Sequence, residues 1–304
     1  MKILSYAYHG GYEYELAKTG HEFTRVCKDV AKCDFGSRKH PENIDCIDDM
    51  PDYRGFDLFF CNSAKIFWQV RDWDIPKVIA LQTHLVGSDR KILKKVPPHV
   101  PTAFISHTCL LQSGLKAGFV IYHSIDTEEW SGYHGSEPHV LMVANHAAPR
   151  KECRLDLFLK IAGGSKWLLA GNNPETPGSV QTSEHEELKE IYRKSRVYLN
   201  TVDAPLTMSM LEAMATGAPA LSFDYGDASY IIKNGVNGFV SNDIGFLREK
   251  LEMLLNDPGL AKSMGEAARE TIKKLFPPKS FQDKWNHLFE LAVANYKLYN
   301  IRGR

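Results

Sequence analysis

The sequence lacks long apolar runs, an excess of one charge and closely spaced cysteines. None of its segments approaches the roughly 18 apolar residues that a membrane-spanning helix needs, and no apolar signal segment follows Met1. Basic and acidic residues both number 37, which excludes an overall attraction to nucleic acid or anionic membranes but leaves local basic patches possible. The six cysteines include no Cys-x-x-Cys pair. We therefore expect a cytoplasmic protein with reduced cysteines and no zinc site.

What is present is typical of a globular α/β protein. The 304 residues are 43% hydrophobic and 24% charged, and this length suffices for two domains. Short apolar runs alternate with amphipathic segments, a pattern that predicts two Rossmann-like, doubly wound domains with parallel sheets. Residues 131–138 contain Gly132, Gly135 and Pro138, as a hinge does. We therefore predict domains at residues 1–130 and 139–279 with a linker at 131–138.

Residues 203–240 form the most informative stretch. A predicted strand at 197–201 is followed by a loop, a helix that starts after Pro205, Gly217, and another buried strand. The free backbone N–H groups at the start of such a helix form an anion site at the carboxyl edge of the sheet. The residues predicted to supply this site are Leu206, Thr207, Met208 and Ser209.

The segments LEAMATGAPALSFDYG and IIKNGVNGFVSND within this stretch resemble the donor-binding signature of retaining glycosyltransferases with the GT-B fold (glycosyltransferase family 4-like, group 1). The resemblance implies that Glu212 holds the ribose hydroxyls of a nucleotide-sugar and that the helix start holds its phosphates. The family has an acidic residue eight positions before this glutamate. Here that position is Ala204, with Asp203 beside it.

Positive charge gathers in the loop at residues 144–154. Arg150, Lys151 and Arg154 follow a predicted strand at 140–143, where fixed cations could stabilise a departing diphosphate; a solvated charge run is the alternative. The resemblance places the family's arginine at Asn145 and its lysine at Arg150 or Lys151. The strand predicted at 167–170 ends at Gly171, Asn172 and Asn173, which we expect near the base or ribose.

In the first domain, Gly10 and Gly11 follow the first strand and allow close backbone approach to a phosphate or sugar. They resemble the family's first glycine loop. His84 follows the strand predicted at 77–81, and the resemblance implies contact with the donor sugar or the acceptor side; a hydrogen-bonded loop histidine is the alternative. The basic cluster Arg90, Lys91, Lys94 and Lys95 is either a solvated face or a patch for an anionic acceptor.

The resemblance implies a glycosyltransferase that moves a sugar from a UDP- or GDP-sugar to an acceptor, with retention and without metal or other cofactor. It also implies that the two domains face a cleft and that a final helix, within residues 280–304, returns to the first domain. The acceptor is open: a glycan, a small molecule or a modified nucleobase. One alternative is a sugar-nucleotide epimerase on the same fold. Another is a non-catalytic sugar-nucleotide-binding module, which Ala204 and Asn145 favour.

Overall fold

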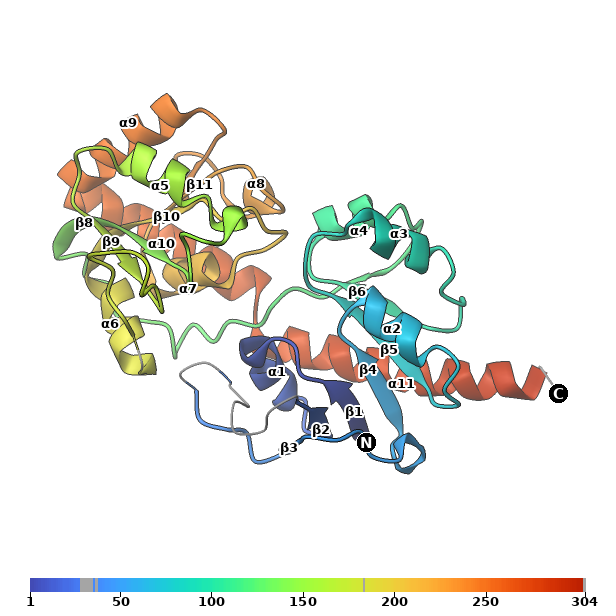
Figure 1. The fold of residues 1–304 in the computed structure, drawn as a ribbon. Coiled ribbons are helices and arrows are strands. Elements are labelled where there is room, and N and C mark those ends of the chain that lie inside the picture. Colours follow the sequence, from blue (N-terminus) through green and yellow to red (C-terminus); the bar gives the residue numbers. More distant parts are fainter. Residues whose placement is uncertain (28–34, 36–37, 183, 303–304) are drawn as a thin grey trace. The chain divides into compact units, whose positions relative to one another are not determined.

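The computed structural model describes the chain except for residues 28–34, 36–37, 183 and 303–304, and it divides into two compact units (Figure 1). Unit 1 contains residues 1–123 and 279–304, and unit 2 contains residues 124–278. Each unit is built on one parallel sheet flanked by helices. Among the described helices, none is both long and apolar enough to cross a membrane.

Unit 1 has seven strands in the order β3-β2-β1-β4-β5-β6-β7, all paired in parallel. Every residue of the central strands β4 and β5 is buried, as expected for a sheet covered on both faces. The strands are β1 (Lys2–Tyr6), β2 (Glu22–Val26), β3 (Ile44–Ile47), β4 (Leu58–Cys61), β5 (Lys77–Leu81), β6 (Thr102–Phe104) and β7 (Phe119–Val120).

Side-chain caps start several helices of unit 1. Ser63 accepts a hydrogen bond from the backbone N–H of Ile66, and Ser106 accepts one from Cys109, so two helices begin directly after β4 and β6. The helices are α1 (Gly10–Ala17), α2 (Ala64–Val70), α3 (Gly87–Leu93), α4 (His107–Ser113) and α11 (Pro278–Arg302), with a 3-10 turn at Tyr53–Gly55.

The last helix, α11, packs within unit 1 (Figure 1). Its Trp285 is fully buried and meets the ring of Tyr12 edge to face at 6.3 Å and that of Phe60 at 5.4 Å. Because aromatic pairs contribute about 0.5–1.5 kcal/mol beyond their buried area, these contacts anchor the helix. The helix expected to return to the first domain does so.

Unit 2 has five strands in the order β12-β11-β10-β8-β9. Helices α5 and α9 pack together, as do α7 and α10. The strands are β8 (Glu137–Val143), β9 (Trp167–Ala170), β10 (Ser195–Asn200), β11 (Ala220–Ser222) and β12 (Gly238–Val240). The helices are α5 (Leu155–Ala162), α6 (His185–Lys194), α7 (Met208–Thr216), α8 (Ala228–Ile231), α9 (Ile244–Asn256) and α10 (Pro258–Leu275), with a 3-10 turn at Lys151–Cys153.

The units divide between His123 and Ser124, earlier than the linker expected at residues 131–138. The segment after Ser124 is held inside unit 2. Trp130 is buried and packs on Tyr192, and the Tyr133 hydroxyl donates to the carbonyl of Arg196 at 2.8 Å. The glycines in this segment marked its turns rather than a free linker.

The cysteines differ from expectation at one position. Cys27, Cys61, Cys109 and Cys153 are buried free thiols, as predicted. Cys46 is disulfide-bonded, so the expectation of a reduced thiol is wrong there. Cys33 lies outside the described residues.

Candidate functional site

The candidate site lies at the carboxyl edge of the unit 2 sheet. Strands β8 and β10 are hydrogen-bonded neighbours, but the chain visits β9, on the other side of β8, between them. The loops after β8 and β10 therefore leave this edge in opposite directions. Parallel α/β sheets bind their ligands at such a switch point.

Hydrogen bonds join these two loops. The backbone N–H of Asp203 donates to the carbonyl of Glu152 at 2.7 Å, and the hydroxyl of the buried Thr201 donates to the carbonyl of Cys153 at 2.9 Å. A third segment, at Gly226, packs against the loop after β10. Gly226 has φ +54°, and a Cβ there would lie 2.2 Å from the carbonyl oxygen of Pro205. The loop before α7 is thus fixed on both sides.

Three cations follow β8 as predicted, and they differ in their partners. Arg150 donates to Glu152 at 2.9 Å and to the carbonyl of Asn145 at 3.2 Å. Arg154 donates to both carboxylate oxygens of Asp156 and to the hydroxyl of Tyr225, each at 3.2 Å. Lys151 is exposed and has no ion-pair partner among the residues that the structure describes. It is the cation of this loop most available to a ligand.

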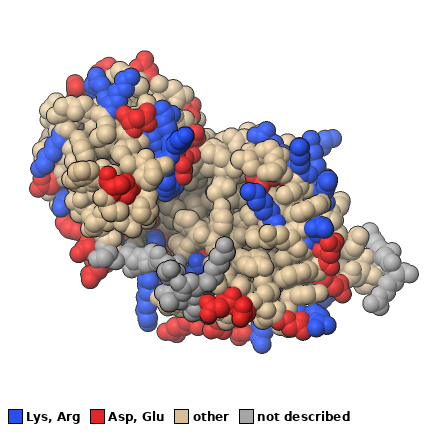
Figure 2. All heavy atoms as spheres, in the orientation of Figure 1, with Lys and Arg blue, Asp and Glu red and all other residues tan. Residues whose placement is uncertain are grey.

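The acids beside these cations are held ionised. A hydrogen bond from its own backbone N–H, and then one from Arg150, lower the pKa of Glu152. The hydrogen bond from Arg154 lowers the pKa of Asp156. Arg150, Lys151, Arg154 and Asp156 line a depression of about 480 Å³, and Figure 2 shows Lys and Arg side chains on the part of unit 2 that carries α5.

Four predicted donor-binding residues brace the loop after β8. Asn173 is fully buried; its amide donates to the carbonyl of Ala144 at 2.7 Å, and its oxygen accepts from the N–H of Ala147 at 2.8 Å. The Asn145 oxygen accepts from the N–H of Asn172 at 2.8 Å. Gly171 has φ +115°, and a Cβ there would lie 2.6 Å from the Ala144 carbonyl oxygen. Both polar atoms of the buried Asn173 side chain position the loop; Asn145 and Asn172 are exposed beside it.

Helix α7 starts later than predicted. It begins at Met208 with Thr207 as N-cap, and no side chain caps it. Leu206 is buried in the preceding loop, because the carbonyl of Pro205 accepts the N–H of Asp227 and holds that loop down. The prediction is thus wrong in placing Leu206 in the helix start. Thr207, Met208 and Ser209 are partly exposed, and the Ser209 hydroxyl lies 2.7 Å from that of Tyr198.

A hydrogen bond from α6 holds the Glu212 carboxylate in place. It is 7% exposed, and its Oε2 accepts a hydrogen bond from the fully buried Tyr192 hydroxyl at 3.0 Å. A carboxylate with one oxygen fixed in this way is preorganised rather than mobile. Burial raises the pKa of the nearby Tyr198, which keeps its hydroxyl protonated.

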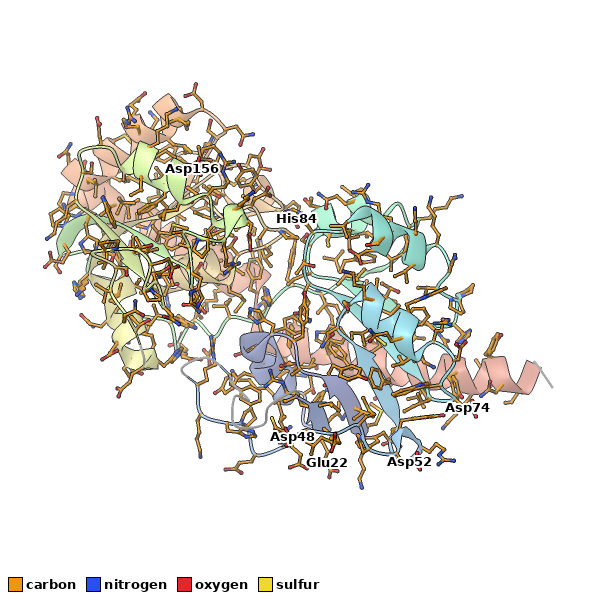
Figure 3. All side chains as sticks on the ribbon, in the orientation of Figure 1. Glu22, Asp48, Asp52, Asp74, His84 and Asp156 are labelled. Carbon is orange, nitrogen blue, oxygen red and sulfur yellow. The ribbon has the colours of Figure 1, made fainter. Side chains whose placement is uncertain are left out.

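The predicted residues of unit 1 lie at the carboxyl edge of its own sheet. His84 lies in the loop between β5 and α3 (Figure 3), with its Nδ1 3.5 Å from Gln112 Oε1. Gly10 and Gly11 form the first turn of α1 rather than a separate tight turn, because His9 caps the helix by accepting the N–H of Tyr12. A Cβ at Gly11 would lie 3.4 Å from the Arg38 guanidinium, an ordinary van der Waals contact.

Sequence reasoning missed the residues that position the others. Tyr192 and Gly226 are not among the residues predicted from the sequence. Both act through contacts made across more than 15 residues of sequence, which periodicity does not report. Unit 1 also contains an Asp-x-Asp spacing, Asp72–Trp73–Asp74. Among the described residues, no group of three or more His, Cys, Asp or Glu could hold a metal ion.

Residues 147–271 match the family described as glycosyl transferases group 1. The chain is 35% identical over 86 residues to a poly(ribitol-phosphate) alpha-N-acetylglucosaminyltransferase of Staphylococcus aureus, and 35% identical over 89 residues to an exopolysaccharide phosphotransferase of Streptomyces coelicolor. These segments are 27% and 28% of this chain but 17% and 9% of the relatives. The chain therefore spans less than a fifth of the length of either curated relative.

Solved structures match more of the chain. Sucrose-phosphate synthase from Thermosynechococcus elongatus has a TM-score of 0.75 at 16% identity, covering 97% of this chain and 99% of that one. Anabaena HepE in complex with UDP-glucose has a TM-score of 0.75 at 14% identity, covering 95% and 99%. These likenesses establish the GT-B fold.

Proposed function

We propose that this chain, which has the GT-B fold and whose residues 147–271 match the glycosyl transferases group 1 family, transfers a sugar from a UDP- or GDP-sugar to an acceptor. The observation that supports this most is the sheet edge where the basic loop is joined to the loop before α7 by the hydrogen bond from Asp203 to Glu152. Cations and backbone N–H groups together are what a diphosphate needs.

In this proposal the basic loop assists departure of the diphosphate. Negative charge grows on the leaving nucleoside diphosphate as the sugar bond breaks, and fixed cations stabilise that charge. Lys151 contacts it directly, while Arg150 and Arg154 must share their charge with Glu152 and Asp156. These cations take the place of a metal ion, so the reaction needs no metal and no other cofactor. We further propose that it proceeds with retention.

Glu212 binds the ribose in this proposal. Its buried position and the hydrogen bond from Tyr192 leave it oriented before the donor arrives. Both ribose hydroxyls are donors, and a carboxylate is acceptor-only when ionised. A fixed carboxylate therefore distinguishes a nucleotide from a simple diphosphate.

The acceptor is proposed at the level of its class. His84 belongs to unit 1, which binds the acceptor in this proposal, whereas the backbone at Gly10 and Gly11 is proposed to contact the donor. A glycan, a small molecule and a modified nucleobase remain the candidates. The Staphylococcus aureus relative is named for poly(ribitol-phosphate), a polymer, which favours a polymeric acceptor such as a glycan over a small molecule. We propose a cytoplasmic location, where nucleotide-sugars are available.

A thermal-shift screen tests the donor. Nucleoside diphosphates and their sugar conjugates are added singly, and a ligand at 100 times its dissociation constant stabilises the protein by about 2.7 kcal/mol. UDP or GDP and one matching sugar conjugate are expected to raise the Tm, and Lys151→Ala is expected to reduce the shift. If none of the nucleotides raises the Tm, the proposal fails.

Product analysis separates the two alternatives. An epimerase converts the donor with no acceptor present, whereas a transferase releases its diphosphate in step with acceptor glycosylation. The binding-module alternative rests on Ala204 and Asn145. It predicts tight donor binding with no turnover against any glycan in an acceptor library.

A further inference from the structure

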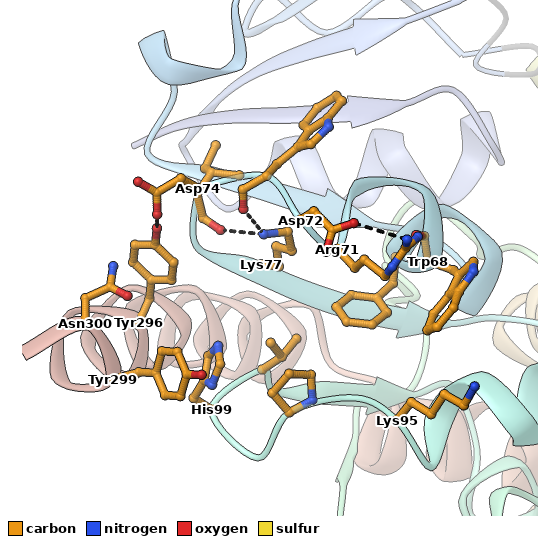
Figure 4. A pocket seen from close by; sticks show the side chains of 15 residues that line it. Trp68, Arg71, Asp72, Asp74, Lys77, Lys95, His99, Tyr296, Tyr299 and Asn300 are labelled. Carbon is orange, nitrogen blue, oxygen red and sulfur yellow. Dashed lines mark hydrogen bonds and ion pairs between the residues drawn. The ribbon is translucent and has the colours of Figure 1, made fainter. Parts of the chain in front are cut away.

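Unit 1 contains a cavity of about 350 Å³ that the proposed reaction does not use. It lies at the amino edge of the sheet, where β5 begins, between the end of α2 and the last turns of α11 (Figure 4). His84, Gly10 and Gly11 are at the carboxyl edge, so the cavity is at the opposite edge of the sheet from them. Its volume is within the range of about 300–1,000 Å³ found for small-molecule sites.

A buried lysine forms the floor of this cavity. Lys77 is 7% exposed, and its ammonium donates to the carbonyls of Trp73 and Ile75 (Figure 4). An ammonium has three donors, and the third has no partner among the residues that the structure describes. Burial lowers the pKa of Lys77, and the nearby carboxylates of Asp74 and Asp72 oppose that shift only in part. An anion in the cavity would stabilise the charged form further.

The carboxylates of the wall are already engaged. Asp72 pairs with Arg71 at 3.1 Å, and Asp74 accepts a hydrogen bond from the Tyr296 hydroxyl. Each keeps further acceptor sites, because a carboxylate offers about four. The cavity thus combines an unsatisfied cationic donor with acceptors suited to hydroxyl groups.

Aromatic rings form the rim. The His99 and Tyr299 rings stack at 4.0 Å, and Tyr299 is 56% exposed. The Lys95 ammonium lies 5.2 Å from the centre of the Trp68 ring, so this second cation is held at the entrance. A sugar ring has an apolar face and polar edges. It can pack that face on an exposed aromatic ring while its hydroxyls meet the polar groups beside it.

We propose that this cavity binds an anionic saccharide unit, a sugar that carries a phosphate or a carboxylate. The anion binds Lys77, the hydroxyls donate to Asp72 and Asp74, and the apolar face of the sugar covers Tyr299. Lys95, held over Trp68 at the other end of the cavity, adds positive charge that attracts the anion (Figure 4). A bare anion would meet the two carboxylates without hydroxyls to offer them, and a neutral sugar would leave Lys77 unsatisfied. The combination therefore selects a ligand that carries both.

The neighbouring surface offers a competing occupant. Lys91 and Lys94 continue the positive charge from Lys95 along α3, where Figure 2 shows Lys and Arg side chains. A flat anionic membrane would use this whole surface equally. An enclosed site would depend on Lys95, which lines the cavity, and not on Lys94, which does not.

The first experiment compares three probes by calorimetry on the full chain: glucose 6-phosphate, glucose and inorganic phosphate. We expect saturable binding of glucose 6-phosphate, at least about tenfold tighter than either of the others, because charge-assisted and hydroxyl hydrogen bonds act together. Glucuronic acid, the carboxylate counterpart, should bind as well. Equal affinity for phosphate and glucose 6-phosphate, or no saturable binding of either acid, would overturn the proposal.

Two matched variants then locate the site. Lys95→Gln is expected to weaken glucose 6-phosphate binding by about two- to fivefold, and the adjacent Lys94→Gln to leave it unchanged. Lys77→Met should weaken it by at least about tenfold, with folding checked by circular dichroism. Equal loss in the two glutamine variants, or binding to phosphatidylglycerol vesicles that both variants weaken alike, would favour the membrane instead.

This proposal and the proposed transfer reaction are tested by different measurements, so one can be refuted while the other holds. Calorimetry of glucose 6-phosphate binding, with no nucleotide present, tests the cavity. The donor site is read out by the rise in Tm with UDP or GDP, which Lys95→Gln is expected to leave unchanged.

Discussion

Replacing Asn173 by alanine tests whether this side chain builds the loop after β8 or binds a ligand. Asn173 is fully buried, and its two ends satisfy the carbonyl of Ala144 and the N–H of Ala147 at 2.7 and 2.8 Å. Asn173→Ala removes both partners at once. The loop that carries Asn145 and Arg150 should then lose its support.

The expected loss of stability follows from the two buried backbone groups that lose their hydrogen bonds, the carbonyl of Ala144 and the N–H of Ala147. A buried backbone group left without its hydrogen bond costs about 1–3 kcal/mol, so two cost about 2–6 kcal/mol in the free energy of unfolding. For a domain of this size that is a fall in Tm of at least about 4 °C. The donor should also bind more weakly, because Arg150 donates to the carbonyl of Asn145 within the same loop.

Asn172→Ala is the matched control. Asn172 is adjacent and exposed, and it takes part in the loop through its backbone N–H and carbonyl, which alanine retains. Thermal unfolding of both variants, with and without UDP, makes the comparison. A loss of less than about 0.5 kcal/mol for Asn173→Ala, or equal losses in the two variants, would refute the reasoning.

Four further predictions concern other residues. Glu212→Gln should weaken nucleotide affinity at least about tenfold in calorimetry, because a charged acceptor becomes neutral; unchanged affinity would refute its role. Lys151→Ala should lower turnover more than donor affinity, since charge grows during departure; equal losses would indicate ground-state binding. Gly171→Ala should destabilise the protein by at least about 1 kcal/mol, because of its φ of +115° and the Ala144 carbonyl; an unchanged Tm contradicts this. Burial lowers the pKa of His123 to about 3, below its usual 6.5, so this group's contribution to stability should be lost as the pH falls from about 6.5 towards 3. Between pH 6.5 and 5 this loss is about 1.6 kcal/mol. In denaturant unfolding, His123→Phe should reduce the fall in the free energy of unfolding over this pH range by about that amount; a variant with the same fall as the unsubstituted chain would disprove it.

The sequence predicted the fold where one physical rule decides the element. The strands at residues 77–81 and 167–170 occur with the predicted bounds, because short apolar runs define them. The start of α7 was misplaced by the proline rule. Pro205 favours a helix start, but its carbonyl is committed to Asp227, and only the tertiary structure contains that contact.

The candidate site shows the same division. The clustering of Arg150 and Lys151 at a strand end follows from sequence, because the loop after a parallel strand must lie at the carboxyl edge. The sequence does not predict which of these two side chains is available to a ligand. Glu152 and its hydrogen bond to Arg150 decide it, and a sequence carries charges without their pairing.

The bonds that tie residue 203 to residue 152, and the contact of Gly226 with Pro205, have a consequence for engineering donor preference. If one loop alone were replaced by that of another enzyme, its carbonyl and N–H groups would not match the hydrogen-bond partners in the neighbouring loops. Residues 144–154, 201–207 and 225–227 should therefore be exchanged together, as a single cassette.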